Sequence, residues 1–300
     1  MKIQLSDHFT YKKLLRFTLP SIIMMVFTSI YGVVDGFFVS NFVGKTPFAA
    51  VNFIMPFLMI LGSIGFMFGT GSSALISKTM GEGDFDKKLF SLFIYVSAAC
   101  GIVIAVFGIV FIRPIATFLG AKDTMLDGCV AYGRIILAAL PAYMLQFEFQ
   151  SFFVTAQKPQ LGLAVTIAAG MANMVLDALL VAVFPLGLEG AAAAPAISQC
   201  VGGLIPLIYF GHPNSSLLRL TKTKYDGKAL LKACTNGSSE LMSNISTSVV
   251  SMLYNVQLMK YAGEDGVAAY GVLMYVNMIF LAAFIGFSVG PAPVIGYSYG

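Results

Sequence analysis

Residues 14–40 read LLRFTLPSIIMMVFTSIYGVVDGFFVS, and the stretch between Arg16 and Asp35 carries no charge. This segment is long enough to cross a bilayer as an α-helix, which needs about 20 apolar residues. Asp35 lies near its end, where an ionisable side chain is costly unless it faces a cavity or a partner. The segment therefore predicts a membrane-spanning helix that carries a functional acid.

The rest of the chain has the same apolar character. Of its 300 residues, 58% are hydrophobic and only 11% are charged. A soluble domain is nearer one quarter charged, so we expect neither a water-soluble enzyme nor, given the apolar content, a disordered chain. The sequence predicts an all-α polytopic membrane protein with about eight transmembrane helices. We place these helices at 14–40, 47–76, 90–112, 128–153, 160–184, 188–210, 234–260 and 267–290.

The basic residues predict the orientation of these helices. Most of the 18 Lys and Arg residues fall on the same side of the predicted spans as the N-terminus. The positive-inside rule places that side in the cytoplasm, so we expect a multi-pass protein of the cell (inner) membrane with a cytoplasmic N-terminus. Residues 211–232 hold the densest basic group and read as a cytoplasmic linker between units 1–210 and 233–300. A solvated loop without a further role explains the same residues, and a site for anionic lipid is a weaker reading.

Two turns of the chain echo each other. Residues 43–50 read VGKTPFAA and residues 262–269 read AGEDGVAA, each between two apolar segments. Repeated helical units are typical of secondary transporters. The echo predicts one six-helix lobe followed by the first two helices of a second, pseudo-symmetric lobe. We therefore expect the sequence to be truncated after the eighth helix.

Two acids fall at matching depths of two predicted helices. Asp35 and Asp177 lie about 26–28 Å along the first and fifth helices. Asn173 lies one turn before Asp177, Tyr31 one turn before Asp35, and Thr28 about a turn further back. Two neighbouring carboxylates in a low dielectric do not both stay ionised without a cation. We expect a coupling site for H⁺ or Na⁺ here; the alternative is two unrelated acids, each bonded to a local hydroxyl.

The sequence contains few residues or motifs that could support other functional sites. Glu148 and Glu240 lie nearer the cytoplasmic helix ends, where we expect structural or gating salt bridges. The four cysteines show no CxxC spacing, and no phosphate-binding GxxxxGK[ST] motif occurs. We expect no enzyme activity, no cofactor beyond the coupling ion, no metal beyond Na⁺, no nucleic-acid partner and a monomeric chain.

Several short segments, in this order, resemble the multidrug and toxin extrusion (MATE) family of prokaryotic transporters. They are Leu19-Pro20-Ser21, Val34-Asp35-Gly36, Gly69-Thr70-Gly71, Asn173-Met174-Val175-Leu176-Asp177 and Ile197-Ser198-Gln199. The resemblance implies twelve helices in two six-helix lobes around a cavity that opens alternately to each side. It also implies efflux of organic cations in exchange for H⁺ or Na⁺.

The resemblance assigns roles to individual residues. Asp35, Asn173 and Asp177 match the ion site of the first lobe, and Pro20 matches a proline at which the first helix bends. One position departs from the pattern, because Pro195 stands where relatives often have a threonine. The lost hydroxyl and backbone donor favour H⁺ over Na⁺.

The sequence thus predicts a secondary active antiporter that exports amphipathic, mostly cationic drugs or toxins by alternating access within the lipid bilayer. Small-molecule organic cations would be the partners, with Tyr31, Thr28 and Pro20 lining the cavity. The alternative is a flippase for lipid or lipid-linked oligosaccharide of the same wider superfamily. That activity needs a basic cavity, but Lys and Arg are almost absent from the predicted spans, Arg134 being the nearest. A lipid-modifying membrane enzyme is a further alternative, but no intramembrane His, Cys pair or Ser/Lys dyad supports it.

Overall fold

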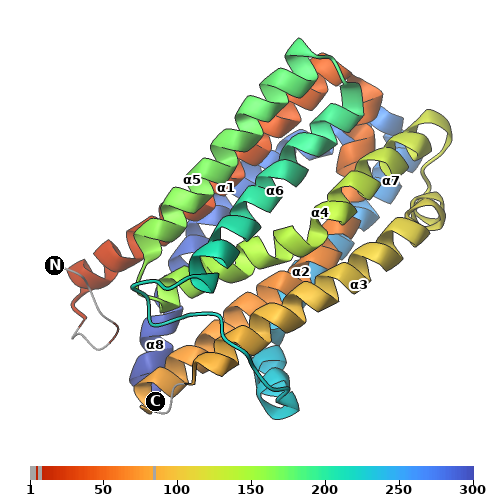
Figure 1. Ribbon diagram of the computed structural model, residues 1–300. Coiled ribbons are helices and arrows are strands. Elements are labelled where there is room, and N and C mark those ends of the chain that lie inside the picture. Colours follow the sequence, from red (N-terminus) through yellow and green to blue (C-terminus); the bar gives the residue numbers. More distant parts are fainter. Residues whose placement is uncertain (1–4, 6–8, 84–85) are drawn as a thin grey trace.

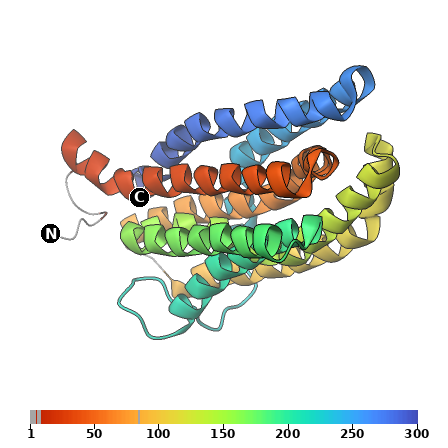
Figure 2. The ribbon, with the colours of Figure 1, turned by 90° about the horizontal axis from the view of Figure 1, so that it is seen from above.

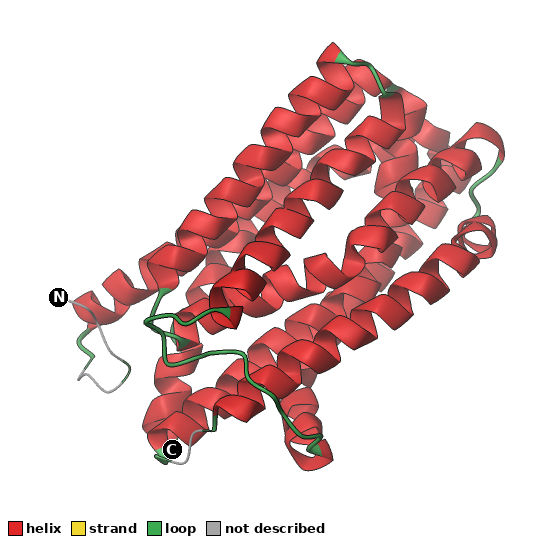
Figure 3. Cartoon of the chain, in the orientation of Figure 1, coloured by secondary structure: helices red, strands yellow, loops and turns green. Residues whose placement is uncertain are grey.

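The computed structural model describes residues 5, 9–83 and 86–300. Within these residues every regular element is helical, as predicted (Figures 1 and 3). The α-helices are α1 Tyr11–Phe38, α2 Lys45–Gly81, α3 Lys87–Leu119, α4 Asp123–Thr155, α5 Pro159–Asp177, α6 Gly187–Gly211, α7 Gly227–Val289 and α8 Ala292–Tyr299, and the π-helical segments are η1 Val39–Val43 and η2 Ala178–Val183.

The described residues contain seven helices that are long and apolar enough to cross a membrane. They lie side by side in one bundle, with α2 and α4 in its interior (Figures 1 and 2). Helix α1 runs between α5 on one side and α7 on the other (Figure 2). Apolar side chains of α3, such as Phe107 and Val110, are exposed on the outer surface, as lipid-facing residues of a membrane helix are. The chain is a multi-pass membrane protein.

Helix α7 reverses direction at a single residue. Gly263 has φ +62° and ψ −154°, while the residues on both sides are helical. The rings of Tyr254 and Tyr270 consequently stack with centroids 5.3 Å apart, whereas a straight helix would separate them by about 24 Å. The loop expected between helices 234–260 and 267–290 is therefore a one-residue break, and the two predicted spans are two arms of α7. Glycine suits this position because a positive φ is strained for other residues.

Helix α7 also begins earlier than the sequence pattern indicates. It starts at Gly227 rather than at 234, because the Asp226 carboxylate accepts hydrogen bonds from the backbone N–H groups of Lys228 and Ala229 at 3.0 and 3.1 Å. This is an N-terminal cap, which stabilises a helix start. The part of the expected linker that lacks helix is thus 212–226.

Glycines of α2 bring α2 and α4 into close contact. A Cβ at Gly65 would lie 2.6 Å from the Cα of Met144, and one at Gly69 would lie 3.0 Å from the Cα of Glu148. Gly62 similarly leaves room for the ring of Tyr143. Small residues allow such close backbone approach in membranes, where packing drives helix association.

The two echoing turns contact each other at the end of the bundle opposite the 212–226 segment. Lys45 forms an ion pair with Asp265, and the Thr46 hydroxyl donates to Glu264 at 2.7 Å. In the sequence echo, Lys45 corresponds to Glu264 and Thr46 to Asp265, so the contacts are crossed. Crossed pairing is the pattern that a two-fold relation between two similar elements produces.

Candidate functional site

Two acidic side chains meet inside the bundle where α1 passes α5. Asp35 lies on α1 and Asp177 is the last residue of α5, and their carboxylates are close enough to interact with each other. Asp35 is 6% exposed and Asp177 is 0% exposed. Among the described residues, no Lys or Arg forms an ion pair with either acid. The pair therefore places two acids in the interior without a basic partner.

Each acid lies beside a local change of helix type. Asp177 directly precedes the π-helical segment η2, and Asp35 lies one turn before η1, whose first residue, Val39, donates its N–H to the Asp35 carbonyl. Segments η1 and η2 also contact each other. A π-helical turn has hydrogen bonds between residues five apart instead of four, and such turns are frequent at functional sites. The apolar sequence pattern predicts plain helices here, so neither π-helical turn was predicted.

Asn173 completes an oxygen-rich cluster with the two acids. It is fully buried one turn before Asp177, and neither its amide nitrogen nor its amide oxygen has a hydrogen-bond partner within the described protein. Both Asp177 oxygens and Asp35 Oδ1 also lack one. Buried polar atoms are normally paired, so this arrangement calls for a proton or a small cation that oxygen atoms can hold.

Two tyrosines border the cluster and were not predicted. Tyr132 of α4 is fully buried, its hydroxyl has no described partner, and it interacts electrostatically with Asp35 and Asp177. Tyr275 of α7 faces Asp35, and its ring fills the space left by Gly36, where a Cβ would lie 2.7 Å from the ring. The spacing of residues along α1 and α5 could not predict these two tyrosines, because they lie on other helices.

Tyr31 links the acids to α4. It lies near Asp35 on α1, and its hydroxyl interacts with Gln146 of α4 and with Thr28. Gly170 of α5 leaves room for its ring, since a Cβ there would be 2.7 Å from Tyr31 Cδ1. The Thr28 hydroxyl also donates to the Met24 carbonyl at 2.9 Å. Tyr31 and Thr28 thus lie together on the face of α1 that turns towards α4 and α5.

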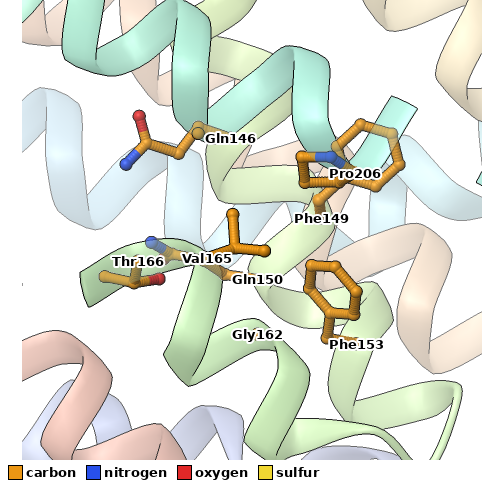
Figure 4. A pocket seen from close by; sticks show the side chains of 9 residues that line it. Gln146, Phe149, Gln150, Phe153, Gly162, Val165, Thr166 and Pro206 are labelled. Atoms are coloured by element: carbon orange, nitrogen blue, oxygen red, sulfur yellow. The ribbon is translucent and has the colours of Figure 1, made fainter. Parts of the chain in front are cut away.

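A small cavity continues from Gln146 between α4, α5 and α6. It has a volume of about 10 Å³, which matches one water molecule. Figure 4 shows Gln146 and Gln150 projecting from α4 and Thr166 from α5 around it. Both amide atoms of Gln150 and Gln146 Oε1 lack a partner among the described residues. The remaining lining is mainly apolar, so this cavity suits water better than a drug-sized molecule.

Three other predicted residues lie away from the acids or differ from expectation. Pro20 lies about 22 Å before Asp35 along α1, and α1 continues through it. Glu148 is fully buried, and neither of its oxygens has a partner among the described residues, so the predicted salt bridge is not found there. Glu240 is half-buried and likewise has no ion pair with a described residue. Charged residues of the neighbouring helices cluster at helix ends, too far away to pair with Glu148.

Comparison with known proteins identifies the family. The sequence profile of the family described as MatE matches residues 20–179, which is more than half of the chain. The chain belongs to the MatE family. The resemblance predicted from the segments around Asp35 and Asp177 is thereby confirmed.

Relatives of this MatE chain include multidrug export proteins. It is 27% identical over 292 residues to the multidrug export protein MepA of Staphylococcus haemolyticus, covering 96% of this chain and 64% of that protein. It is 26% identical over 293 residues to MepA of Staphylococcus aureus strain N315, with the same coverage. The chain thus spans about 64% of the length of these relatives.

Solved structures share the fold. The MATE multidrug transporter DinF-BH superposes with a TM-score of 0.88 at 23% identity, over 99% of this chain and 68% of that one. An inward-facing multidrug resistance MATE family transporter superposes with a TM-score of 0.80 at 21% identity, over 91% of this chain and 63% of that one. These likenesses show the helical arrangement of a MatE protein.

Proposed function

We propose that this chain acts in secondary active export of amphipathic, mostly cationic small molecules, which it exchanges for H⁺ or Na⁺ by alternating access. The observation that carries the proposal is the buried pair of Asp35 and Asp177, which has no basic partner among the described residues. Membership of the MatE family and the multidrug export relatives support it.

The chemistry of the pair provides the coupling. Two carboxylates in a low dielectric need a proton or a cation between them. A bound H⁺ or Na⁺ removes one negative charge from the cluster, and its release restores that charge. Asp35 and Asp177 thereby attract an organic cation only after the coupling ion has left. Competition between the two positive species is what an exchanger requires.

The neighbouring residues position the acids for this exchange. Asn173 offers both a donor and an acceptor to the pair, and the hydroxyls of Tyr132 and Tyr31 offer further donors. We favour H⁺ as the coupling ion. Pro195 of α6 contributes neither a hydroxyl nor a backbone N–H, so the α6 side supplies fewer oxygen ligands for Na⁺.

We further propose that the chain consists of one six-helix lobe and the start of a second. The boundaries are 1–210 for the first lobe, 211–232 for the cytoplasmic linker and 233–300 for the second lobe. The crossed contacts of Lys45 with Asp265 and of Thr46 with Glu264 support a two-fold relation between the units. On this proposal the protein is monomeric, lies in the inner membrane and has its N-terminus in the cytoplasm.

A dye-efflux assay tests the proposal. The Asp177→Asn variant keeps the size of the side chain but removes the negative charge, so ion-driven efflux of ethidium from loaded cells should be lost while the membrane level stays normal. The control is Asp123→Asn, an exposed acid in the first turn of α4. Wild-type efflux by Asp177→Asn would overturn the assignment of the coupling site.

The flippase alternative has no supporting observation. A pyrophosphate-linked lipid needs cationic partners, and no Lys or Arg among the described residues pairs with the buried cluster. Labelled lipid translocation by the same protein, with no ethidium efflux, would support that alternative instead.

A further inference from the structure

Glu148 is a buried acid that the proposed exchange does not use. It lies on α4, is 0% exposed, and neither carboxylate oxygen has a hydrogen-bond partner within the described protein. Its Cα packs against α2, where the Gly69 Cβ position lies 3.0 Å away, and Glu148 does not line the small cavity. Gln146, two residues earlier, instead contacts Gly202 of α6. Glu148 therefore belongs to a different face of α4 from the polar groups that lead to Asp35.

Within the described part of the chain, no charged residue pairs with Glu148. Its polar neighbour is the hydroxyl of Ser97 on α3, which is also fully buried. The titratable groups of α3 closest in sequence to Ser97 are the exposed Tyr95 and the half-buried Cys100. All charged residues of the packed helices α2 and α3 lie near helix ends; they are Lys45, Lys78, Lys87, Lys88 and Arg113.

An isolated carboxylate at such a place is very costly. Burial of an ionised acid without a partner in a membrane interior costs several kcal/mol. A protonated carboxyl avoids this cost and can donate a hydrogen bond to the Ser97 hydroxyl. One hydroxyl offers too few oxygen ligands for a metal cation. The environment of Glu148 therefore selects a proton rather than Na⁺.

A series of hydroxyls leads from Glu148 towards the end of the bundle that carries the 212–226 segment. Ser151 lies one turn further along α4, facing Gly69 of α2. Thr155 follows one turn later, and its hydroxyl lies 2.6 Å from that of Ser73 on α2. Ser73, Ser151 and Thr155 are all buried. Glu148 is about 10 Å from Thr155 along the helix, and Thr155 is the last residue of α4, so these hydroxyls connect Glu148 to the helix end.

We propose that Glu148 is a second proton-binding site, which exchanges one H⁺ with the aqueous phase at this end of the bundle, independently of Asp35 and Asp177. Its existence does not depend on the transport activity proposed above.

Infrared spectroscopy tests the proposal without any transport assay. In the purified protein, a protonated buried carboxyl gives a carbonyl stretch distinct from that of a carboxylate. We expect Glu148→Gln to lose one such band at neutral pH, and Glu240→Gln, the matched half-buried control, to keep it. Asp177→Asn should also keep it. A Glu148→Gln spectrum that keeps every protonated-carboxyl band of the wild type would overturn the proposal, and so would loss of the band assigned to Glu148 in Asp177→Asn.

A second variant covers the case in which Glu148→Gln does not fold. Ser97→Ala removes the hydroxyl neighbour and leaves the acid in place. The carbonyl band should then shift in frequency but remain, because the protonated carboxyl can no longer donate a hydrogen bond to this hydroxyl. An unshifted band would assign the signal to another acid and contradict the proposal.

Discussion

Asp35 on α1 and Asp177 at the end of α5 bring two buried carboxylates together beside two π-helical segments, η1 and η2. Up to that level, α1 and α5 are each regular α-helices. Short π-helical segments of this kind are frequent at functional sites. Ion binding by the pair would thus act directly beside two π-helical segments.

Tyr132 should contribute to ion exchange through its hydroxyl. Tyr132→Phe keeps the buried ring and removes the group that interacts with Asp35 and Asp177. We expect ethidium efflux to fall roughly two- to tenfold, the factor for a hydrogen bond of about 0.5–1.5 kcal/mol. Tyr261→Phe, which changes a ring that is 78% exposed, is the control. Equal efflux by both variants would show that the Tyr132 hydroxyl has no role.

A side chain added where α2 contacts α4 should lower the stability of the protein. Gly65→Ala places a methyl group 2.6 Å from the Cα of Met144, and overpacking of this kind costs about 1–3 kcal/mol. We expect a lower midpoint of thermal unfolding for the protein purified in detergent. The control is Gly32→Ala on α1, where no heavy atom lies within 4 Å of the new Cβ.

The two glycine variants should change the midpoint of thermal unfolding differently. Alanine is favoured over glycine in a helix interior by about 0.5–1 kcal/mol, so Gly32→Ala should leave the midpoint unchanged or raise it. If both variants lower the midpoint equally, the packing of α2 against α4 is not the cause.

The crossed turn contact should open and close during transport. The Lys45–Asp265 ion pair is exposed, and exposed pairs contribute little to stability, so a cross-link tests the contact better than a charge deletion does. In a variant with all native cysteines replaced by serine, Lys45→Cys with Asp265→Cys should form a disulfide under mild oxidation. Efflux should stop and return after reduction.

A distant pair of cysteines provides the control for that experiment. Lys45→Cys with Lys228→Cys places the two thiols at opposite ends of the bundle, so no intramolecular disulfide should form. Full efflux by the cross-linked Lys45–Asp265 variant would contradict a role for this contact in alternating access.

Much of the fold follows from the sequence because the bilayer fixes helix length. The apolar runs predicted the helices, and equal depth predicted that Asp35 and Asp177 lie at the same level. The roles of these residues remain predictions. Features that depend on contacts between helices could not be predicted: the π-helical turns, the approach of Tyr132 and Tyr275, and the unpaired state of Glu148. The turn between the last two spans was predicted, but its length was not, because Gly263 reverses α7 at a single residue with positive φ.

The most direct test of the central claim is the affinity of the purified protein for ethidium as a function of pH and of Na⁺ concentration. If the Asp35–Asp177 pair holds either the coupling ion or the organic cation, the wild-type affinity should fall as pH is lowered or as Na⁺ is raised. The affinity of Asp177→Asn should not change with either condition. A wild-type affinity that is independent of both, or an unaltered dependence in Asp177→Asn, would contradict the account.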